Sequence, residues 1–470
     1  MASALRAKIP TLDVGILDAP ALEMGWRSLE SELRRRRPTL IAMGEEADVC
    51  VESFRLARLA RSINARVIAG GSFFEHVARE TLATELVDVV VHGEGESTIV
   101  DLARALAEDA RSGLTMIAGI SFLDPGGLVT TPPRQVTPCL DDLPLPAYDL
   151  LPCDRYGARS KTHPHLASIE MSRGDPITTG LFRYWKPSQF PFPSPMQPPL
   201  RLKSPQRLLE EVRILVQKHG RQYLGWVDPC LNTDPQVPGE FAELLLRENL
   251  ALGQSAWARP EGIIRDASTG ALASCIQSGL NEIGLIVERT DRFGRIPEGD
   301  SLGMAQTREA VDILRCRFPS VFILGAFPYG FPEDSRATIN ALYHNVARLD
   351  LDASLFVPLV PLPGTPGWDP GLWDPTGENM RQLHFLPDST GDNHLRELEE
   401  EINELGFFYW PRSRIHSFLG HLACRHSRRR RLRWLLFGRT IRFHARNLIR
   451  KATLGPEESP LLVFPKWYET

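Results

Sequence analysis

The sequence predicts an α/β protein in which a doubly wound parallel sheet is followed by a partial (β/α) barrel and a helical, basic tail. Short β-branched runs alternate with amphipathic helical stretches over residues 12–122, and a second series of this kind starts at Ala167. Six prolines crowd the segment 132–152 between the two series: Pro132, Pro133, Pro138, Pro144, Pro146 and Pro152. Clustered prolines are typical of a linker. The 470 residues, 43% of them hydrophobic, are enough for two or three cores.

The first series predicts a domain over residues 1–135. Its strands are expected at Leu12–Leu17, Thr39–Met43, Ala65–Ala69, Val87–His92 and Ile117–Phe122. Between them, Val51–Ser62 and Ser97–Glu108 carry apolar residues at helical spacing. Such alternation predicts a parallel sheet of the flavodoxin or Rossmann type with crossover helices on its faces. The proline-rich linker then covers residues 136–165.

The second series predicts a barrel domain over residues 166–370. Its strands are expected at Ala167–Met171, Tyr223–Val227, Glu282–Val287, Val321–Gly325 and Ser354–Leu359. Ser204-Pro205 is a strong helix start, because serine is a favourable N-cap and proline fits the first turn. Gly220 is expected to end that helix. Residues 371–470 are expected to form a helical C-terminal region.

The C-terminal region contains a basic stretch. Residues 425–451 hold eleven Lys and Arg residues, including Arg428–Arg431, interleaved with Trp434 and Phe437. Such a stretch fits nucleic acid, an anionic membrane surface or an acidic partner, and it equally fits a solvated helix face that closes the barrel. We favour the solvated face. The net charge of −4 gives no strong signal for nucleic-acid binding.

The seven cysteines are scattered, which excludes the spacing of a disulfide framework or a zinc site. The sequence shows no secretory signal and no apolar run long enough to span a bilayer. We therefore expect a cytoplasmic protein without a transmembrane segment.

Four motifs occur in a characteristic order. They are Ala69-Gly70-Gly71-Ser72, Asp88-Val89-Val90-Val91-His92-Gly93-Glu94-Gly95-Glu96, Gly119-Ile120-Ser121-Phe122 and Leu140-Asp141-Asp142-Leu143-Pro144-Leu145-Pro146-Ala147. This ordered series resembles the landmarks of the cobalamin-binding radical S-adenosylmethionine (SAM) enzymes. That family includes methyltransferases that act on unactivated carbons and the anaerobic cyclase of chlorophyll synthesis. The resemblance extends along nearly the whole chain.

The resemblance implies a cobalamin site over two loops that follow predicted strands. Its residues would be Gly70, Gly71, Ser72, Gly93, Glu94, Gly95 and Glu96. Loops at the carboxyl ends of parallel strands are where such sheets bind ligands, and glycines let a flat ring approach the backbone. The alternative is that these loops are only tight turns. We expect His92 to be a surface residue and no histidine of the chain to be a lower ligand of cobalt, since the Asp-x-His-x-x-Gly motif is absent.

The resemblance also implies a first strand and helix ahead of Ala2–Lys8. Either translation begins upstream of Met1, or the domain is damaged. The first strand of a flavodoxin-like sheet lies inside the sheet, so we expect its absence to expose the edges of its neighbours.

The barrel domain opens with Ser168-Ile169-Glu170-Met171-Ser172-Arg173-Gly174-Asp175-Pro176, where the family has a Cys-x3-Cys-x2-Cys loop. The same spacing falls here on Asp175, Thr179 and Phe182, none of which is a thiolate. Because iron–sulfur clusters are held by cysteine thiolates, we expect no four-iron, four-sulfur cluster and no standard radical cleavage of SAM.

Four polar residues are weak catalytic candidates at the predicted barrel mouth: Asp175, Asp228, Arg259 and Glu288. The family's Gly-Ile-Glu-Ser stretch reads here as Ile286-Val287-Glu288-Arg289, which also places SAM binding in question. Two classes of function remain. One is an altered enzyme, favoured slightly, that uses cobalamin and SAM as a methyltransferase would and acts on a small molecule. The other is a non-catalytic pseudoenzyme that regulates or accompanies a paralogous radical SAM enzyme.

Overall fold

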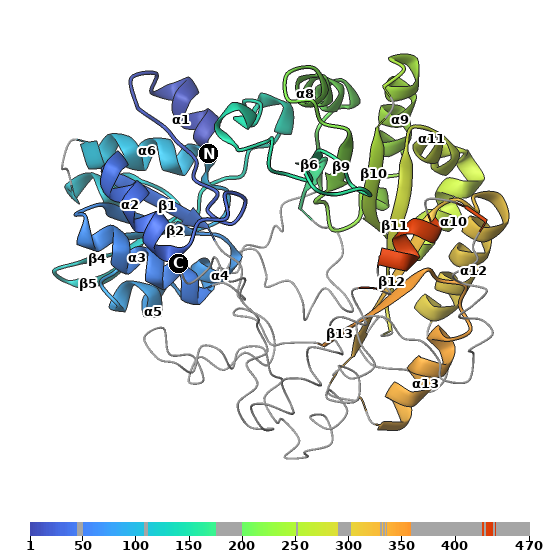
Figure 1. The fold of residues 1–470 in the computed structure, drawn as a ribbon. Coiled ribbons are helices and arrows are strands. Elements are labelled where there is room, and N and C mark those ends of the chain that lie inside the picture. The colour runs from blue at the N-terminus through green and yellow to red at the C-terminus, as the bar shows by residue number, and fades with distance from the viewer. Residues whose placement is uncertain are drawn as a thin grey trace.

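The computed structural model describes residues 1–44, 50–107, 111–174, 200–250, 252–289, 302–329, 331, 334 and 336–358, together with residues 425–426, 429–435 and 438. These residues form two main sheets, which lie on opposite sides of the molecule in Figure 1. The prediction of an α/β fold with two sheet-containing units is thus confirmed. Within the described ranges, no helix combines the length and apolar character that crossing a membrane requires.

The first sheet has the strand order β1-β2-β3-β4-β5. The bounds of its strands are Leu40–Gly44 for β1, Arg66–Gly70 for β2, Val89–Val91 for β3, Ile120–Asp124 for β4 and Gly127–Thr130 for β5. The first three strands are parallel, so their carboxyl ends share one edge of the sheet. The last two are antiparallel and form a hairpin.

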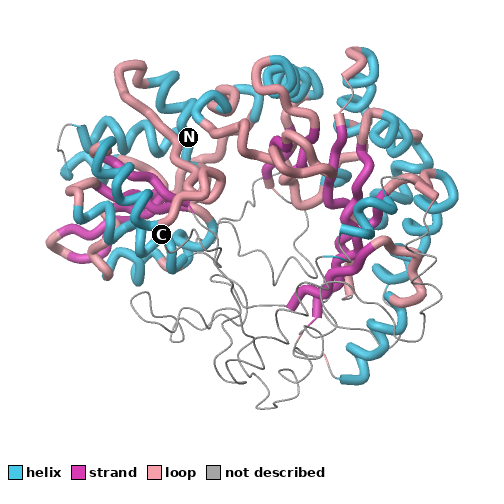
Figure 2. The backbone as a smooth tube through the Cα atoms, viewed as in Figure 1, coloured by secondary structure: helices cyan, strands magenta, loops and turns pink. Residues whose placement is uncertain are grey.

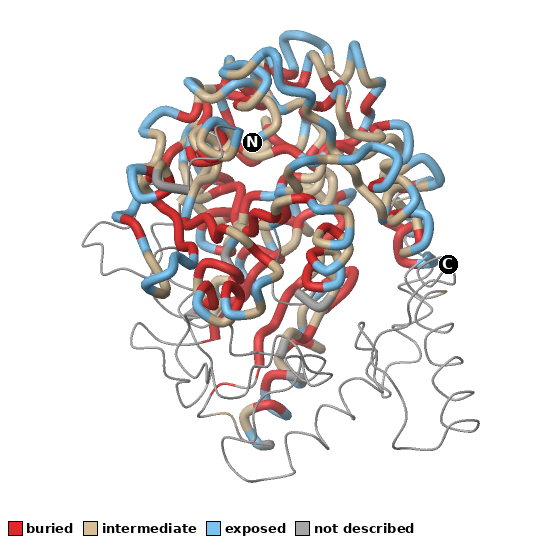
Figure 3. The backbone as a smooth tube through the Cα atoms, turned by 90° about the vertical axis from the view of Figure 1, so that its left-hand side faces the viewer, coloured by how far each residue is buried: buried red, intermediate tan, exposed pale blue. Residues whose placement is uncertain are grey.

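Helices cover both faces of the first sheet. Their bounds are Ala2–Lys8 for α1, Trp26–Arg36 for α2, Cys50–Ser62 for α3, Ser72–His76 for α4, Ala78–Ala83 for α5 and Gly95–Ala107 for α6. One core joins α3, α4 and α5 to the strands through Phe54, Phe73 and Leu82. A second core joins α1 and α6 to the opposite face through Ala4 and Leu102. Figure 3 shows the buried strands between helices whose outer sides are exposed.

Three expectations for this sheet were wrong. Leu12–Leu17 forms no strand, because the segment runs outside the sheet with no residue of the run buried. β4 is antiparallel to β3, and the turn Asp124-Pro125-Gly126-Gly127 folds it into a hairpin with β5. A missing first strand was expected to expose the edges of neighbouring strands inside the sheet. No such exposed edge lies between β1 and β2, because these strands pair directly from Leu40–Arg66 to Gly44–Gly70.

The second sheet is parallel throughout, with the strand order β13-β12-β11-β10-β9-β6. Its strands are β6 Leu166–Ile169, β9 Tyr223–Trp226, β10 Gly253–Ala258, β11 Leu280–Ile286, β12 Phe322–Tyr329 and β13 Ala353–Pro358. Its helices are α8 Pro205–Gln217, α9 Val237–Arg247, α10 Pro260–Thr269, α11 Ala271–Gln277, α12 Leu302–Arg317 and α13 Arg336–Val346. The helices lie outside the curved sheet, as a partial barrel requires (Figure 2).

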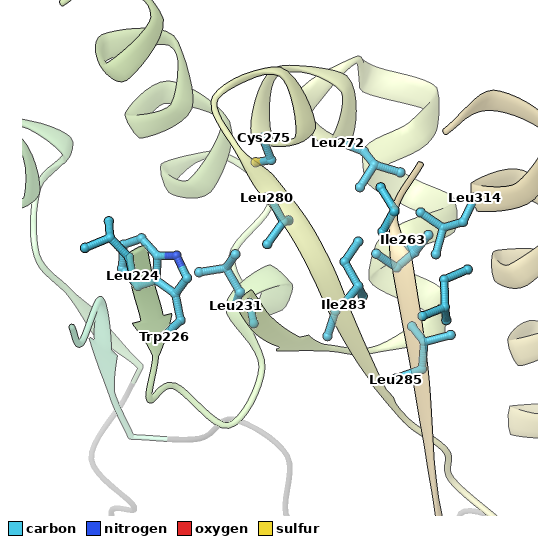
Figure 4. Close-up of a cluster of buried hydrophobic side chains, with 14 of the residues drawn as sticks. Leu224, Trp226, Leu231, Ile263, Leu272, Cys275, Leu280, Ile283, Leu285 and Leu314 are labelled. Atoms are coloured by element: carbon cyan, nitrogen blue, oxygen red, sulfur yellow. The ribbon is translucent and has the colours of Figure 1, made fainter. Parts of the chain in front are cut away.

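The core of the barrel lies between the sheet and these helices. Ile283 and Leu285 of β11 point toward Ile263 of α10 and Leu314 of α12 (Figure 4). The predicted start of α8 is confirmed, because Ser204 Oγ accepts the backbone N–H of Arg207 at 3.1 Å and Pro205 occupies the first turn.

The pattern of apolar runs does not indicate strand β10; only the resemblance of Trp257-Ala258-Arg259 to a family strand points to it. Its run Gly-Gln-Ser-Ala-Trp-Ala has few β-branched residues, so its strand propensity is low. Packing explains Gly253, because the ring of Tyr223 on β9 fills the space beside it, and the ring of Trp257 on β10 in turn fills the space beside Gly284 of β11. Tertiary context therefore determines this strand.

The described part of the basic stretch includes a helical turn over residues 429–435. Leu432 packs there against Phe322 and Ala353 of the barrel. Arg429 and Arg433 are buried, with 6% and 4% of their surface exposed, so the expectation of a fully solvated basic face was wrong for these two residues. Both bind Asp352, a carboxylate that solvent does not reach.

Candidate functional site

A cavity of about 470 Å³ lies where the carboxyl ends of the two sheets meet. One wall comes from the first sheet and includes Gly44, Gly70 and Gly93 at the ends of β1, β2 and β3. The other wall comes from the barrel and from a two-stranded ribbon, formed by β7 (Ser172–Arg173) and β8 (Arg201–Leu202). Its volume lies within the ~300–1,000 Å³ typical of ligand sites.

The cavity collects six of the seven residues predicted to hold a cofactor: Gly70, Gly71, Gly93, Glu94, Gly95 and Glu96. The seventh, Ser72, begins α4 directly behind them. Gly71 has φ of +96° and Gly93 has φ of +68°, a backbone region that side chains with a Cβ rarely adopt. The two turns therefore require glycine, and they leave the ends of β2 and β3 uncovered by side chains at these positions.

Glu94 and Glu96 bind arginines across the cavity rather than facing it freely. Arg201 contacts Glu94 with an Nη2–Oε1 distance of 2.6 Å. Arg173 contacts Glu96 at 2.9 Å, Glu94 at 3.6 Å and Glu170 at 3.0 Å. Although burial alone would raise it, the hydrogen bond from Arg173 holds the pKa of Glu96 below its usual value. These contacts join the loop after β3 to both strands of the β7–β8 ribbon.

Asp228 also lines the cavity, at the carboxyl end of β9. Its carboxylate accepts the backbone N–H of Met171 at 2.8 Å and the N–H and hydroxyl of Ser172, each at 2.6 Å. Burial raises its pKa despite these three donors. The geometry makes Asp228 an anchor for the chain between β6 and β7, just ahead of the positions that correspond to the family's cluster loop.

The other catalytic candidates lie elsewhere. Arg259 stands at the start of α10, with Glu261 3.7 Å away, and Glu288 follows β11; neither lines the cavity. Asp175, Thr179 and Phe182 lie outside the described residues. In the part of the chain that the structure describes, no group of three His, Cys, Asp or Glu residues is arranged to hold a metal ion.

His92 is buried, with 7% of its surface exposed, so the expectation of a surface histidine was wrong. Its Nε2 lies 2.7 Å from the hydroxyl of Ser121, which in turn lies 2.8 Å from that of Thr130. Burial, together with the neighbouring His76, lowers the pKa of His92 to about 4. His92 is not among the residues that line the cavity. Its ring belongs to the β3–β4–β5 side of the sheet.

Sequence reasoning missed four charged residues of the cavity wall: Glu75, Glu170, Arg173 and Arg201. Glu75 is 6% exposed, and its Oε2 accepts the backbone N–H of Gly93 at 2.9 Å. Burial raises the pKa of Glu75 to about 8. One signal was available for Glu170 and Arg173, since they flank the end of a predicted apolar strand. Nothing in the sequence pairs them with the distant Glu94 and Glu96.

No protein family profile matches the chain. A protein of Pyrococcus horikoshii named as an uncharacterized methyltransferase is 24% identical over 360 residues, which cover 76% of this chain and 74% of the relative. The anaerobic magnesium-protoporphyrin IX monomethyl ester cyclase of Cereibacter sphaeroides is 23% identical over 368 residues. That match covers 75% of this chain and 56% of the cyclase.

Solved structures with the same fold include two cobalamin-dependent radical SAM proteins. The methyltransferase TsrM from Kitasatospora setae, solved with cobalamin and a [4Fe-4S] cluster, superposes with a TM-score of 0.58 at 16% identity, over 78% of this chain and 70% of that chain. OxsB with aqua-cobalamin bound gives the same TM-score and identity, over 76% of this chain and 50% of that chain. In its relatives and in its fold, the chain is thus similar to the cobalamin-binding radical SAM enzymes.

Proposed function

We propose that the chain binds cobalamin in the cavity between the two sheets and acts as a methyltransferase-like enzyme on a small molecule. The observation that carries this proposal is that the glycine loops after β2 and β3 share one cavity with the mouth of the barrel. Cobalamin, when bound, supplies a transferable methyl group or one-electron chemistry, while the protein supplies orientation and electrostatics. The named activities of the relatives support this class of function.

The described residues fit such a cofactor. Gly70, Gly71 and Gly93 to Glu96 line the cavity, with Ser72 directly behind, and the positive φ of Gly71 and Gly93 keeps side chains away from this edge. A flat macrocycle needs that close approach to the backbone. His92 lies outside the lining. We therefore propose that no histidine of the described chain serves as the lower ligand of cobalt.

The cavity wall formed by the barrel and the β7–β8 ribbon would position the molecule that reacts with cobalamin. Asp228 fixes the backbone at Met171 and Ser172, and Arg173 connects this ribbon to the cofactor loop. SAM is the second cofactor we propose for this side, because SAM is bound in a solved structure of the same fold. Since Asp175, Thr179 and Phe182 supply no thiolate, we propose that a four-iron, four-sulfur cluster is absent.

A second candidate is a non-catalytic relative that regulates or accompanies a paralogous radical SAM enzyme. The specific observation in its favour is that all three cluster positions have lost cysteine. Such a protein could keep the fold, and even the corrinoid cavity, without turnover.

The test is anaerobic purification with added hydroxocobalamin, followed by a visible spectrum and by cobalt, iron and sulfide analysis. We expect about one cobalt per chain and no stoichiometric iron. Gly71→Trp should abolish cobalt retention, because the new side chain enters the cavity. Gly127→Trp is the matched control, since Gly127 also has positive φ, of +115°, but lies in the β4–β5 hairpin with open space beside it.

Unchanged cobalt retention in Gly71→Trp, with unchanged circular dichroism, would show that the cofactor binds elsewhere or that the glycine loops are only turns. Absence of cobalt from the wild-type chain would favour the non-catalytic relative without a cofactor. About four irons and four sulfides per chain would contradict the proposed absence of a cluster.

A further inference from the structure

Glu75 differs from the other glutamates of the cavity wall. It lies on α4, immediately after the Gly70-Gly71 turn, and its side chain is only 5% exposed. Glu94, Glu96 and Glu170 each bind an arginine. Among the residues that the structure describes, no arginine or lysine contacts Glu75. This buried carboxyl thus has no described arginine or lysine to stabilise its ionised form.

The groups that face Glu75 come from its own helix and from the end of β3. On α4, His76 Nδ1 lies 3.7 Å from Oε1. At the end of β3, the backbone N–H of Gly93 donates to Oε2 at 2.9 Å, and His92 precedes it with a pKa lowered to about 4 by burial, so that it is neutral near pH 7. Burial outweighs the single N–H donor and raises the pKa of Glu75 to about 8.

A neutral carboxyl group has one O–H donor in addition to its acceptor oxygens. Gly93 already uses one oxygen of Glu75, and this bond ties the loop after β2 to the loop after β3. The remaining hydrogen-bonding capacity lies in the wall of a cavity. A buried donor of this kind favours a ligand that offers an uncharged oxygen acceptor, because an unmade hydrogen bond there is costly.

We propose that Glu75 recognises the cavity ligand by donating its carboxyl proton to a carboxamide oxygen. The proposal rests on the proposed function, because the rim of the corrin ring carries carboxamide groups. It adds a specificity residue that selects a neutral, amide-bearing ligand over a ligand without an uncharged oxygen acceptor. It also makes binding sensitive to pH.

The test measures the Kd of cyanocobalamin, whose cobalt does not titrate in this range, between pH 6.5 and pH 9. Ionisation of Glu75 removes the donor, so the wild-type Kd should rise roughly tenfold from pH 7 to pH 9. Glu75→Gln keeps an acceptor for Gly93 and a neutral donor, so its Kd should match that of the wild type at pH 7 and stay within about twofold across the range. Glu75→Ala should weaken binding roughly tenfold at pH 7.

A second ligand and a second variant test whether the pH dependence comes from Glu75. Dicyanocobinamide lacks the nucleotide base but retains the ring carboxamides, and it should show the same pH dependence. His76→Gln should keep that dependence, which separates Glu75 from its neighbouring imidazole. Equal pH dependence in the wild type and Glu75→Gln would overturn the inference while leaving the cofactor proposal intact. Failure of the wild type to bind any corrinoid at any pH would overturn both.

Discussion

Single residues decide what the cavity can hold, and their roles depend on neighbours that are distant in the sequence. Gly71 and Gly93 could be read from sequence, because glycine pairs after strands have a clear backbone reason. The burial of His92 could not be predicted from the sequence. Nothing in the segment Val89–Glu96 indicates that the ring of His92 forms a hydrogen bond with Ser121, 29 residues away. The same holds for Glu75 and Gly93.

The buried His92 predicts a loss of stability in acid. Its folded pKa of about 4 lies below the ordinary value of 6.5, so below pH 6.5 the unfolded chain takes up a proton first. The contribution of neutral His92 to the free energy of unfolding is therefore complete above pH 6.5, and it is lost as the pH falls toward 4. We expect His92→Gln, measured by urea unfolding against pH, to lose less stability over this window than the wild type.

His344→Gln provides the control for this measurement, because His344 is an exposed histidine of α13. Its pH profile should follow that of the wild type. If the free energy of unfolding fell equally with decreasing pH in the wild type and in His92→Gln, the imidazole would have to be hydrated or charged in the folded protein, against the observed burial.

At the scale of elements, the strands were more predictable than their pairing. β1, β2, β11 and β12 appear close to their expected positions because β-branched runs bounded by glycine or polar residues are strong local signals. β10 gives no such local signal, because its run has no β-branched residue and Gly253 owes its small size to the ring of Tyr223 on β9. The β7–β8 ribbon was not predicted either, because each of its two strands is only two residues long and 27 residues separate them.

This ribbon forms ion pairs with the loop that follows β3 of the first sheet. Arg201 and Glu94 form a contact of 2.6 Å, with side chains that are 6% and 20% exposed. Removing one partner of a buried pair leaves a desolvated charge, so a double-mutant cycle of Arg201→Met and Glu94→Gln should give a coupling energy of about 2 kcal/mol in chemical unfolding.

The exposed pair Arg247–Glu243 on α9 is the matched comparison, with side chains that are 71% and 55% exposed. Exposed pairs of this spacing contribute only ~0.3–0.5 kcal/mol. If the coupling energy of Arg201–Glu94 were no larger than that of this surface pair, water would have to screen the contact, and the ribbon would not hold the two sheets together.

For the whole molecule, the sequence predicted which units occur but not how they meet. The carboxyl ends of both sheets face one cavity, and this follows from long-range contacts such as Arg173–Glu96 rather than from any local pattern. The basic stretch illustrates the same limit. Its charge suggested a solvated surface, yet two of its arginines are buried against the carboxylate of Asp352, which lies 77 and 81 residues earlier in the chain.

Asp352 connects the barrel to the C-terminal region. It precedes β13, and Arg315, Arg429 and Arg433 all bind its buried carboxylate. Burial opposes ionisation, but the three arginines together hold the pKa of Asp352 below its usual value. The described helical turn over residues 429–435 is thereby fixed to the amino-terminal ends of β12 and β13, away from the cavity.

We therefore expect the double substitution Arg429→Met and Arg433→Met to lower the free energy of unfolding by about 2–4 kcal/mol, because it removes two of the three charges that compensate a buried carboxylate. The matched control is Arg430→Met with Arg431→Met, two exposed neighbours in the same turn, which should change stability by less than ~1 kcal/mol. The measurement is urea unfolding of the full chain. Equal, large losses in both double variants would point to charge along the whole stretch as the stabilising factor. Equal, negligible losses would mean that the turn detaches from Asp352 at little cost, and the barrel would then be stable without it.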